Sequence, residues 1–430
     1  MKHLGIDFGT TNSALAWTEG EGPPSVATFR LHGEVTRTFR SLLYFEADRE
    51  WVRGRPQAWV GPEAIEHYLL TDGDGRLMQS MKTFLASRVV KGTQVFGCDF
   101  PLERLIALII DGVFGASGLP RPRRLVAGRP VRFAGSDSDV DDELADSRLR
   151  KAFAFAGFED IELVLEPVAA ALHYEAGLAQ DETVLVADFG GGTSDFCLLK
   201  VGPSYRHDPT DRARILGTRG VGVAGDALDA RLIQYVVAPE LGADTLYRSQ
   251  SGNFLQIPPG IFEKLRKWNE LSFLKSRQNM DMLLGYLRTA VEPKKVKALV
   301  QVVEHDLGHR LYRAIERTKV DLSSRDEAEL VFADGDIDLR AKVSRRDFEG
   351  WIRPELDAIS RTVDQLMTDT GLAASAVDTV FLTGGTGQVP AVRELFATRF
   401  GEGKLRTGDF LTSIASGLAL HARQLDRGVS

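Results

Sequence analysis

The sequence predicts an α/β protein built from two related lobes, and three observations carry this prediction. The chain has 430 residues, which is enough for two or three domains. A unit of apolar strand, Asp-Phe-Gly turn and second apolar strand occurs twice, at residues 4–17 and 184–199. Short apolar strands alternate with helical patterns between the two copies. Because the copies lie much further apart than the roughly 20–50 residues of a solenoid repeat, they indicate two lobes.

The first copy of the motif opens the chain. Residues 4–8 read as a strand ending in Asp7-Phe8, and residues 12–17 read as its partner. The Gly9-Thr10-Thr11 turn between them is typical of a β-hairpin. Backbone N–H groups of such a turn are open to a phosphate because glycine has no side chain, and the threonine hydroxyls add donors. The Asp before the turn suits Mg²⁺, which binds carboxylates directly or through its own waters.

The segment after the first hairpin predicts an inserted subdomain followed by alternating strands and helices. Residues 38–103 are rich in Trp, Arg and Gly and show no clean period. Residues 123–128 and 161–165 read as short strands on either side of a helix at 141–155. Glu166 then begins a helix to Tyr174, with proline in its first turn.

The second copy of the motif repeats the same parts with more glycine. Residues 184–189 predict a strand that ends in Asp188-Phe189, and residues 194–199 predict its partner. Gly190 to Thr193 form the turn. Either turn alone is as readily structural as functional. Two such hairpins facing each other would hold a polyphosphate from both sides, so the pair is the informative feature.

Residues 220–225 match the G-x-G-x-x-G pattern of dinucleotide-binding folds, but their surroundings do not fit. That fold needs a parallel βαβ unit and an acid about 20 residues further on. Asp244 stands at that distance, yet Pro239 and Gly242 interrupt the helix between its apolar pattern at 227–237 and this acid. No second parallel strand is evident in the pattern. We therefore do not interpret this segment as a dinucleotide site.

The remaining elements are expected as follows. Ser344 caps a long amphipathic helix that runs to about Met367. A strand over 377–382 enters a Gly-rich turn at Gly384, and a helix follows over 391–400. This turn suits the sugar and base of a nucleotide, or serves only as a tight strand-to-helix turn. The stretch 250–325 reads as helical, and its basic run at 294–297 is interpreted as a solvated helix face.

Composition excludes several classes of protein. With 53 Lys and Arg against 60 Asp and Glu, the net charge of −7 argues against a general binder of nucleic acid or anionic membranes. Two cysteines, Cys98 and Cys197, make no disulfide framework or zinc-site spacing and fit a reducing compartment. Asp7 breaks any signal-peptide core, and the longest apolar run, 105–110, is too short to span a bilayer. We expect a cytoplasmic location.

Five motifs in this order resemble the ATPase domain of the DnaK-type heat-shock chaperones, within the superfamily of actin, sugar kinases and heat-shock ATPases. The two hairpins resemble that domain's phosphate motifs, and residues 166–171 resemble its connecting helix. Residues 316–324 and 384–390 resemble its two adenosine motifs. The resemblance covers nearly the whole chain and is strongest to the truncated YegD-like branch.

The resemblance implies a two-lobed actin-like ATPase fold, in which each lobe is ribonuclease-H-like and carries an inserted subdomain. Lobe I would span 1–183 with its insertion at about 38–103. Lobe II would span 184–407 with its insertion at about 226–343. Residues 408–430 would form a C-terminal helix that returns to lobe I. Because the chain stops at Ser430, we expect no peptide-binding domain.

The resemblance also implies roles for single residues, with ATP or ADP and Mg²⁺ as cofactors. Asp7 and Asp188 would hold Mg²⁺ through water, and Lys82 would reach the γ-phosphate. Glu166 and Thr193 would position the attacking water, so Lys82, Glu166, Asp188 and Thr193 are the expected catalytic residues. Phosphoryl transfer needs mainly positioning and charge neutralisation, which these groups supply. The nucleotide would be contacted by Gly9, Thr10, Thr11, Asn12, Gly190, Gly191, Gly192, Thr193, Gly225, Glu316, Lys319, Ser323, Gly384, Gly385, Thr386 and Gln388.

Three places depart from the family pattern. Gln388 stands where the family has an Arg near the base, and Leu411 stands where it has an Asp. Residues 128–131, Gly-Arg-Pro-Val, replace a Val-Pro-Ala pattern beside the catalytic lysine. These departures bear on nucleotide affinity and on the geometry of the attacking water.

The expected function is that of an ATP-binding, slowly hydrolysing chaperone-like ATPase whose output is lobe closure. Its protein client or regulator and its oligomeric state do not follow from the sequence. One alternative is a nucleotide-dependent interaction module with little turnover, which Gln388 and Leu411 favour. A second is a small-molecule kinase of the same superfamily, although no kinase-specific acid follows the first hairpin. An actin-like filament is a more distant third.

Overall fold

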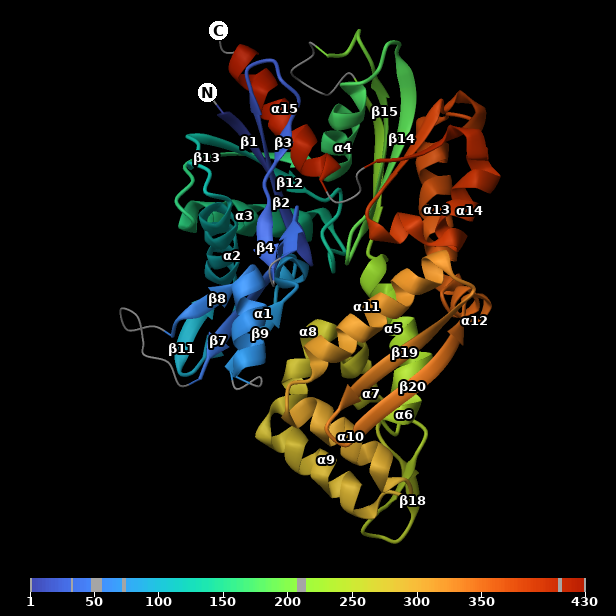
Figure 1. Ribbon diagram of the computed structural model, residues 1–430. Helices are drawn as coiled ribbons and strands as arrows, with labels where there is room; N and C mark the ends of the chain where they lie inside the picture. Colours follow the sequence, from blue (N-terminus) through green and yellow to red (C-terminus); the bar gives the residue numbers. More distant parts are fainter. Residues whose placement is uncertain are drawn as a thin grey trace. The chain divides into compact units, whose positions relative to one another are not determined.

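The computed structural model describes residues 2–31, 34–47, 56–71, 75–206, 214–408 and 412–428. Contacts between residues divide the chain into two compact units. The first unit comprises Met1–Gly225 and Leu356–Ser430, and the second comprises Asp226–Glu355. Each unit is described by itself, with the element labels of Figure 1.

A mixed sheet holds the first hairpin of the first unit. Its strand order is β13-β12-β1-β2-β3, and β6 pairs with β2 beside this path. β1 runs antiparallel to β2 and parallel to β12. The strands of this sheet are β1 (Lys2–Phe8), β2 (Asn12–Glu19), β3 (Ser25–Val26), β6 (Phe39–Arg40), β12 (Arg124–Arg129) and β13 (Asp160–Leu165).

A second sheet repeats this topology around the second hairpin. Its order is β16-β15-β14-β21-β22, with β14 antiparallel to β15 and parallel to β21. Both sheets therefore combine three antiparallel strands with two further parallel ones, which confirms the predicted fold of two ribonuclease-H-like lobes. The strands are β14 (Glu182–Phe189), β15 (Ser194–Val201), β16 (Ile215–Val221), β21 (Thr379–Thr383) and β22 (Leu405–Thr407).

Two helices, α4 (Glu166–Glu175) and α15 (Ser413–Gly428), pack closely in this unit, and α15 also lies against β1 and β2 (Figure 1). A Cβ atom on Gly417 would collide with the carbonyl oxygen of Ala169 in α4. A Cβ on Gly5 of β1 would collide with the backbone of Leu418 and Ala419. Glycine at these two positions is therefore what lets α15 approach both the helix and the sheet.

The other elements of the first unit cover the sheets or extend from them. α2 carries the apolar run 105–110, which is buried except at Leu108, in the hydrophobic core of the first sheet. These elements are β4 (Phe29–Leu31), β5 (Glu34–Thr36), β7 (Leu42–Glu46), β8 (Ala58–Val60), α1 (Gly61–Leu70), β9 (Gly75–Gln79), η1 (Met81–Phe84), β10 (Gly92–Val95), β11 (Cys98–Pro101), α2 (Leu102–Ser117), α3 (Asp139–Phe155), η4 (Ala374–Ala376), η5 (Gly385–Gln388), α14 (Pro390–Phe400) and η6 (Glu402–Lys404).

The second unit is mainly helical and contains two β-hairpins. Its first helix includes a π-helical turn, η2, a rare form of helix. α5 and α13 cross the boundaries between the units. The elements are α5 (Gly225–Leu232), η2 (Ile233–Val237), α6 (Ala238–Glu240), β17 (Leu246–Arg248), β18 (Phe254–Gln256), α7 (Pro259–Arg266), α8 (Trp268–Leu271), η3 (Ser272–Lys275), α9 (Arg277–Thr289), α10 (Pro293–Glu304), α11 (Gly308–Ser324), β19 (Glu327–Asp334), β20 (Ile337–Ser344), α12 (Arg345–Trp351) and α13 (Arg353–Thr370).

One expected helix is wrong in its extent. Ser344 does cap it, since its hydroxyl accepts a hydrogen bond from the Asp347 backbone N–H. The helix ends at Trp351, however, and α13 begins at Arg353. Pro354 accounts for the break, because proline lacks the N–H of a helix interior but suits the first turn of a new helix. The predicted single helix over 344–367 is thus two helices.

Candidate functional site

The first phosphate-type turn is fixed by backbone contacts. A Cβ on Gly9 would collide with the carbonyl oxygen of Asn12, so the turn between β1 and β2 requires glycine there. The Ser41 N–H donates to the carbonyl of Thr11 at 2.9 Å. Arg40 donates to the Asn12 side chain at 3.3 Å, so this amide already has a structural partner. Thr10 and Thr11 lie at the partly exposed tip.

The second turn closes tightly between β14 and β15. The Gly190 N–H donates to the carbonyl of Thr193 at 2.9 Å. The strand register places Asp188 opposite Asp195. Gly225 also reaches this turn, because its N–H donates to the Gly190 carbonyl at 3.3 Å. Three residues predicted to contact the nucleotide, Gly190, Thr193 and Gly225, therefore gather at one place.

A buried ion pair lies beside these turns. The Nζ atom of Lys82 is 2.6 Å from Oε1 of Glu166, and both side chains are less than a tenth exposed. Lys82 comes from the short helix η1, and Glu166 comes from the first turn of α4. Gly128 of β12 makes room, since a Cβ there would lie 3.0 Å from Cγ of Glu166. The glycine that departs from the family pattern thus packs directly on a predicted catalytic residue.

Carboxylates surround this pair and raise one another's pKa. Burial, with the charge of Glu166, raises the pKa of Asp7 to about 7. The pKa of Asp188 lies well above its ordinary value, because of burial and then of Glu166 and Asp195. Burial lowers the pKa of Lys82, but Glu166 and Asp7 outweigh it, so the net shift is upward and the side chain is charged. The predicted residues Asp7, Lys82, Glu166 and Asp188 therefore form one electrostatically linked cluster.

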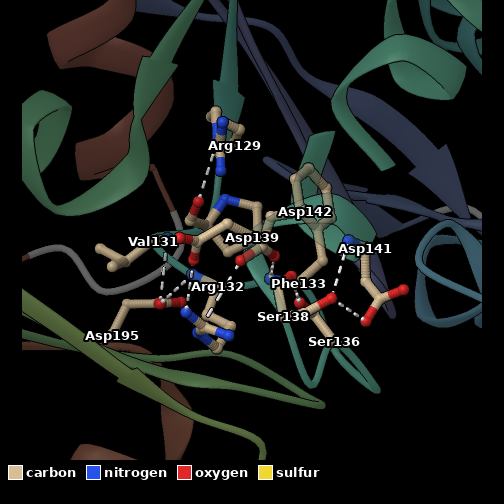
Figure 2. Close-up of polar contacts among 11 residues, drawn as sticks. Arg129, Val131, Arg132, Phe133, Ser136, Ser138, Asp139, Asp141, Asp142 and Asp195 are labelled. Atoms are coloured by element: carbon tan, nitrogen blue, oxygen red, sulfur yellow. Dashed lines mark hydrogen bonds and ion pairs between the residues drawn. The ribbon is translucent and has the colours of Figure 1, made fainter. Parts of the chain in front are cut away.

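Asp195 belongs to this cluster although sequence reasoning missed it. Its Oδ1 accepts from the backbone N–H groups of Val131 and Arg132, at 3.0 and 3.2 Å, and Figure 2 shows the carboxylate facing that turn. Its Oδ2 accepts from the Thr193 hydroxyl at 3.0 Å. Burial and the charge of Glu166 raise its pKa to about 7. Asp195 thus connects the predicted water-positioning Thr193 to the segment 128–133.

The donor set fits a hydrated magnesium ion better than direct ligation. The cluster supplies carboxylate oxygens, which Mg²⁺ prefers, and it holds one lysine against several acids. Within the described residues, no group of three or more His, Cys, Asp or Glu is arranged to hold a metal directly. Mg²⁺ usually keeps several of its waters, so binding through water needs no such cage.

A cavity of about 870 Å³ adjoins the turn that holds Asp195. It is lined by α3, by residues 129–132 and by β16 around Gly220. Its charged walls are paired with each other, as in Arg129 with Asp146 at 3.0 Å and Arg132 with Asp139 at 3.3 Å. The cavity lies next to the carboxylate cluster but contains none of its predicted catalytic residues.

The Gly-rich turn after β21 has both structural and open positions. Gly384 has φ of +82°, and a Cβ there would collide with the backbone of Phe189. Its glycine is therefore required by packing on β14. Gly385 is exposed with no neighbour near its missing Cβ, while Thr386 is buried and Gln388 is exposed. Leu411, the other departure from the family pattern, lies outside the described residues.

The predicted adenosine residues of α11 belong to the second unit. Glu316, Lys319 and Ser323 are partly exposed and spaced to share one helix face. Lys319 pairs with Asp229 of α5 at 2.8 Å. Burial lowers the pKa of Lys319, but Asp229 outweighs it and the net shift is upward. The lysine is therefore charged and already neutralised within its own unit.

Comparison with known families decides the identity of this fold. The model of the family described as Hsp70 protein matches residues 146–244 and 281–428, which is more than half of the chain. The chain belongs to the Hsp70 family. Its two ribonuclease-H-like sheets are accordingly those of the actin-like ATPase fold. The G-x-G-x-x-G segment begins in the last two residues of β16, Gly220 and Val221, and β16 is antiparallel to β15, so this segment is not part of a parallel dinucleotide-binding unit.

Individual relatives agree with this assignment. The chain is 25% identical over 422 residues to heat shock 70 kDa protein 7, chloroplastic, of Arabidopsis thaliana, covering 92% of this chain and 48% of that protein. It is 24% identical to the chaperone protein DnaK of Thermosipho africanus, covering 97% of this chain and 58% of that protein. The chain thus spans about half the length of the curated relatives it matches. No helix among the described residues has the length and hydrophobicity needed to cross a membrane.

Proposed function

We propose that this Hsp70-family protein binds ATP with Mg²⁺ and hydrolyses it slowly. We further propose that its output is closure of the two lobes, which acts on a protein client or regulator. The observation that supports this most directly is the Lys82–Glu166 pair at 2.6 Å, with Asp7, Asp188 and Asp195 around it. These groups lie where the two repeated hairpins present their turns. We keep a cytoplasmic location as part of the proposal, and both cysteines are free.

Each residue has a role that follows from its contacts. When bound, Mg²⁺ would neutralise charge on the phosphates, and the carboxylates of Asp7 and Asp188 would hold its waters. The Lys82 ammonium, charged and oriented by Glu166, would donate hydrogen bonds to a terminal phosphate oxygen. The Thr193 hydroxyl donates its hydrogen bond to Asp195, so the hydroxyl oxygen can accept a hydrogen bond from a water. Glu166, with its second carboxylate oxygen, would accept from that same water.

The glycines of the two turns supply backbone N–H donors for the phosphates, from residues 9–11 and 190–193. Lobe closure follows as a proposal because each turn comes from a different sheet. A polyphosphate held by both turns would favour the arrangement in which they lie closest. The adenosine contacts proposed for residues 384–388 come from the first unit, and those proposed for Glu316, Lys319 and Ser323 would add the second unit to the same ligand.

The test is a single-turnover assay with radiolabelled ATP and Mg²⁺. We expect Asp188→Ala and Thr193→Ala to lower phosphate release by at least about 100-fold, since removing one group that stabilises the transition state costs roughly 10²–10³ in rate. Asp369→Ala is the matched control, because this acid pairs with Arg219 on the surface, outside the cluster. Release at the parent rate in Asp188→Ala would refute the mechanism.

Two other outcomes would select the rival functions. Tight ATP binding by the wild-type chain without phosphate release above background would make it a nucleotide-dependent interaction module. Consumption of ATP stimulated many-fold by one sugar or polyol would make it a small-molecule kinase.

A further inference from the structure

A short β-hairpin in the second unit has no role in the proposed ATP site. It consists of β17 and β18, joined by a turn in which the Ser249 N–H donates to the Asn253 carbonyl at 2.8 Å. The family model matches residues up to 244 and again from 281, so the hairpin lies in the stretch that this match passes over. The match to the family model therefore does not extend to this hairpin.

The hairpin is held firmly along one edge. Tyr247 of β17 forms a bridge with Ala290, and the Val291 N–H donates to the Leu246 carbonyl at 2.8 Å. The rings of Tyr247 and Tyr286 of α9 lie 4.6 Å apart. β17 is thus paired on both sides and one face of the hairpin rests on α9. A surface anchored in this way is ordered before any partner arrives, which lowers the entropy cost of binding.

The other edge and the other face of the hairpin are open. Among the described residues, β18 pairs only with β17, so the N–H and C=O groups on its outer side have no strand partner. Residues directly opposite in an antiparallel pair share a face, so Phe254 and Arg248 point the same way. On this face Phe254 is 60% exposed and Leu246 is 41% exposed, whereas Leu255 lies opposite Tyr247 on the face toward α9. Free strand edges with exposed apolar side chains are templates for another strand.

The charge around the hairpin indicates which charge a partner strand would carry. Residues 244–297 contain ten Lys and Arg but five Asp and Glu, and two of these cations, Lys275 and Lys297, pair with Asp306 and Asp336 outside this stretch. Arg248, Arg288 and Lys294 are exposed, and none of them forms an ion pair with a described residue. Of the acids beside the hairpin, Glu292 pairs with Lys295 at 3.3 Å, and Asp244 is exposed. An acidic segment is complementary to this surplus of cations, and a basic one is not.

We propose that β18 is the docking edge for an extended segment of a partner protein in which acidic and apolar residues alternate. Main-chain hydrogen bonds to β18 supply affinity, as in other cases of strand addition. The apolar residues of the segment continue the face formed by Leu246 and Phe254. Its acids meet the surrounding arginines and lysines.

The test uses the full chain and a fluorescein-labelled peptide of four alternating Glu and Val pairs, with binding followed by anisotropy at low salt. A peptide of the same composition in two blocks controls for charge, and one N-methylated at alternate residues controls for main-chain pairing. We expect the alternating peptide to bind at least tenfold more tightly than either control. Hydrogen exchange of β18 amides slows when it binds.

Two variants make the proposal falsifiable. Phe254→Ser and Arg248→Glu each weaken binding at least tenfold, whereas Val331→Ser, an exposed apolar position on β19 of the same unit, leaves it unchanged. The proposal is overturned if the alternating and block peptides bind equally, if Phe254→Ser binds like wild type, or if nothing binds at roughly 1 mM peptide, the weak end of specific affinity. Self-association of the wild-type chain that Phe254→Ser abolishes would instead identify a second copy as the occupant. ATP turnover is unaffected by Phe254→Ser, so this result is independent of the proposed ATPase.

Discussion

At the scale of single residues, the candidate site is defined by an imbalance of charge. Asp7, Glu166, Asp188 and Asp195 lie within electrostatic reach of one another, and Lys82 is the cation that opposes them. In the absence of bound cations this arrangement costs stability, because buried carboxylates that share a site repel one another. The same imbalance is what makes the site attractive to a hydrated divalent ion.

The raised pKa of Asp195 predicts a particular dependence of stability on pH. The folded protein holds this proton up to pH about 7, whereas an unfolded Asp releases it near 3.8. Because the folded state binds more protons between these values, the free energy of unfolding falls as pH rises through this window and is lowest above pH 7. Asp195→Asn removes that titration, and its amide oxygen can still accept from Val131 and Arg132. We expect it to raise stability at pH 8 by a few kcal/mol, at ~1.4 kcal/mol per pKa unit.

Urea denaturation of nucleotide-free wild type and Asp195→Asn at pH 5, 6, 7 and 8 measures this effect. The variant curve should be flatter, and the two should approach each other at pH 5. The exposed acid Asp338 provides the control, since Asp338→Asn should run parallel to wild type. Parallel curves for Asp195→Asn would contradict the assigned pKa.

Sequence reasoning found most of the residues that the structure gathers, and it missed one for a clear reason. Asp7, Glu166 and Asp188 stand in motifs with recognisable neighbours, so their pattern was visible without coordinates. Asp195 is the one acidic residue of β15, and most of its neighbours in that strand are apolar. Its importance comes from the β14–β15 register and from the turn at Val131, and neither can be seen from local spacing.

At the scale of elements, close backbone approach is the device that assembles the site. Glu166 is positioned because α4 is fixed against α15, and Gly417 permits that crossing at Ala169. Gly384 permits a similar approach to β14 at Phe189. Gly384 and Gly417 lie among the site residues in the fold, but their role is to let neighbouring elements pack closely.

Gly417→Ala therefore destabilises the protein. The added methyl group would collide with the backbone carbonyl of Ala169, and backbone cannot rotate away as a side chain can. We expect a loss of about 3 kcal/mol or more, at or above the upper end of overpacking effects. Thermal unfolding measures it. Gly285→Ala on α9 is the matched control, because no atom lies near its missing Cβ. This change should raise the free energy of unfolding by about 0.5–1 kcal/mol. Equal midpoints for the two variants would contradict the crossing.

The elements that sequence reasoning missed are those whose signals are short or tertiary. The two repeated hairpins were predictable because strand, turn and strand recur with the same residues. The hairpin β17–β18 has strands of three residues, and β18 lies in the stretch 250–325, so the prediction that this whole stretch is helical is wrong there. Its cue was the turn-forming run Ser249 to Asn253 between apolar pairs. The break at Ile352 could have been read from Pro354.

At the scale of the whole molecule, the predicted nucleotide contacts fall in both compact units. The phosphate turns belong to the first unit, while Glu316, Lys319 and Ser323 belong to the second. One ligand that touches both would make their unfolding interdependent, because it binds only when both are folded. The division into two compact units does not test the lobe boundaries at residues 183 and 407, which stay predictions.

Calorimetry with two ligands tests this coupling. ATP with Mg²⁺ at 100 times its Kd should stabilise the chain by about 2.7 kcal/mol and bring the unfolding of both units together. Inorganic triphosphate with Mg²⁺ lacks the nucleoside and should stabilise the first unit alone. Ser323→Ala should reduce the effect of ATP and leave that of triphosphate unchanged. An equal effect of both ligands would rule out the adenosine contacts on α11.

The packing of α15 on β1 also has a consequence for synthesis. β1 spans Lys2–Phe8 and α15 spans Ser413–Gly428, so the ribosome makes the helix about 400 residues after the strand that it covers. At 5–20 residues per second this interval is roughly 20–80 s. Ala14 and Ala16, which pack on Ala415 and Ala419 in the finished protein, face no partner during that time. The sheet that contains β1 and β2 is thus covered on this side only after α15 has been made, about 400 residues later.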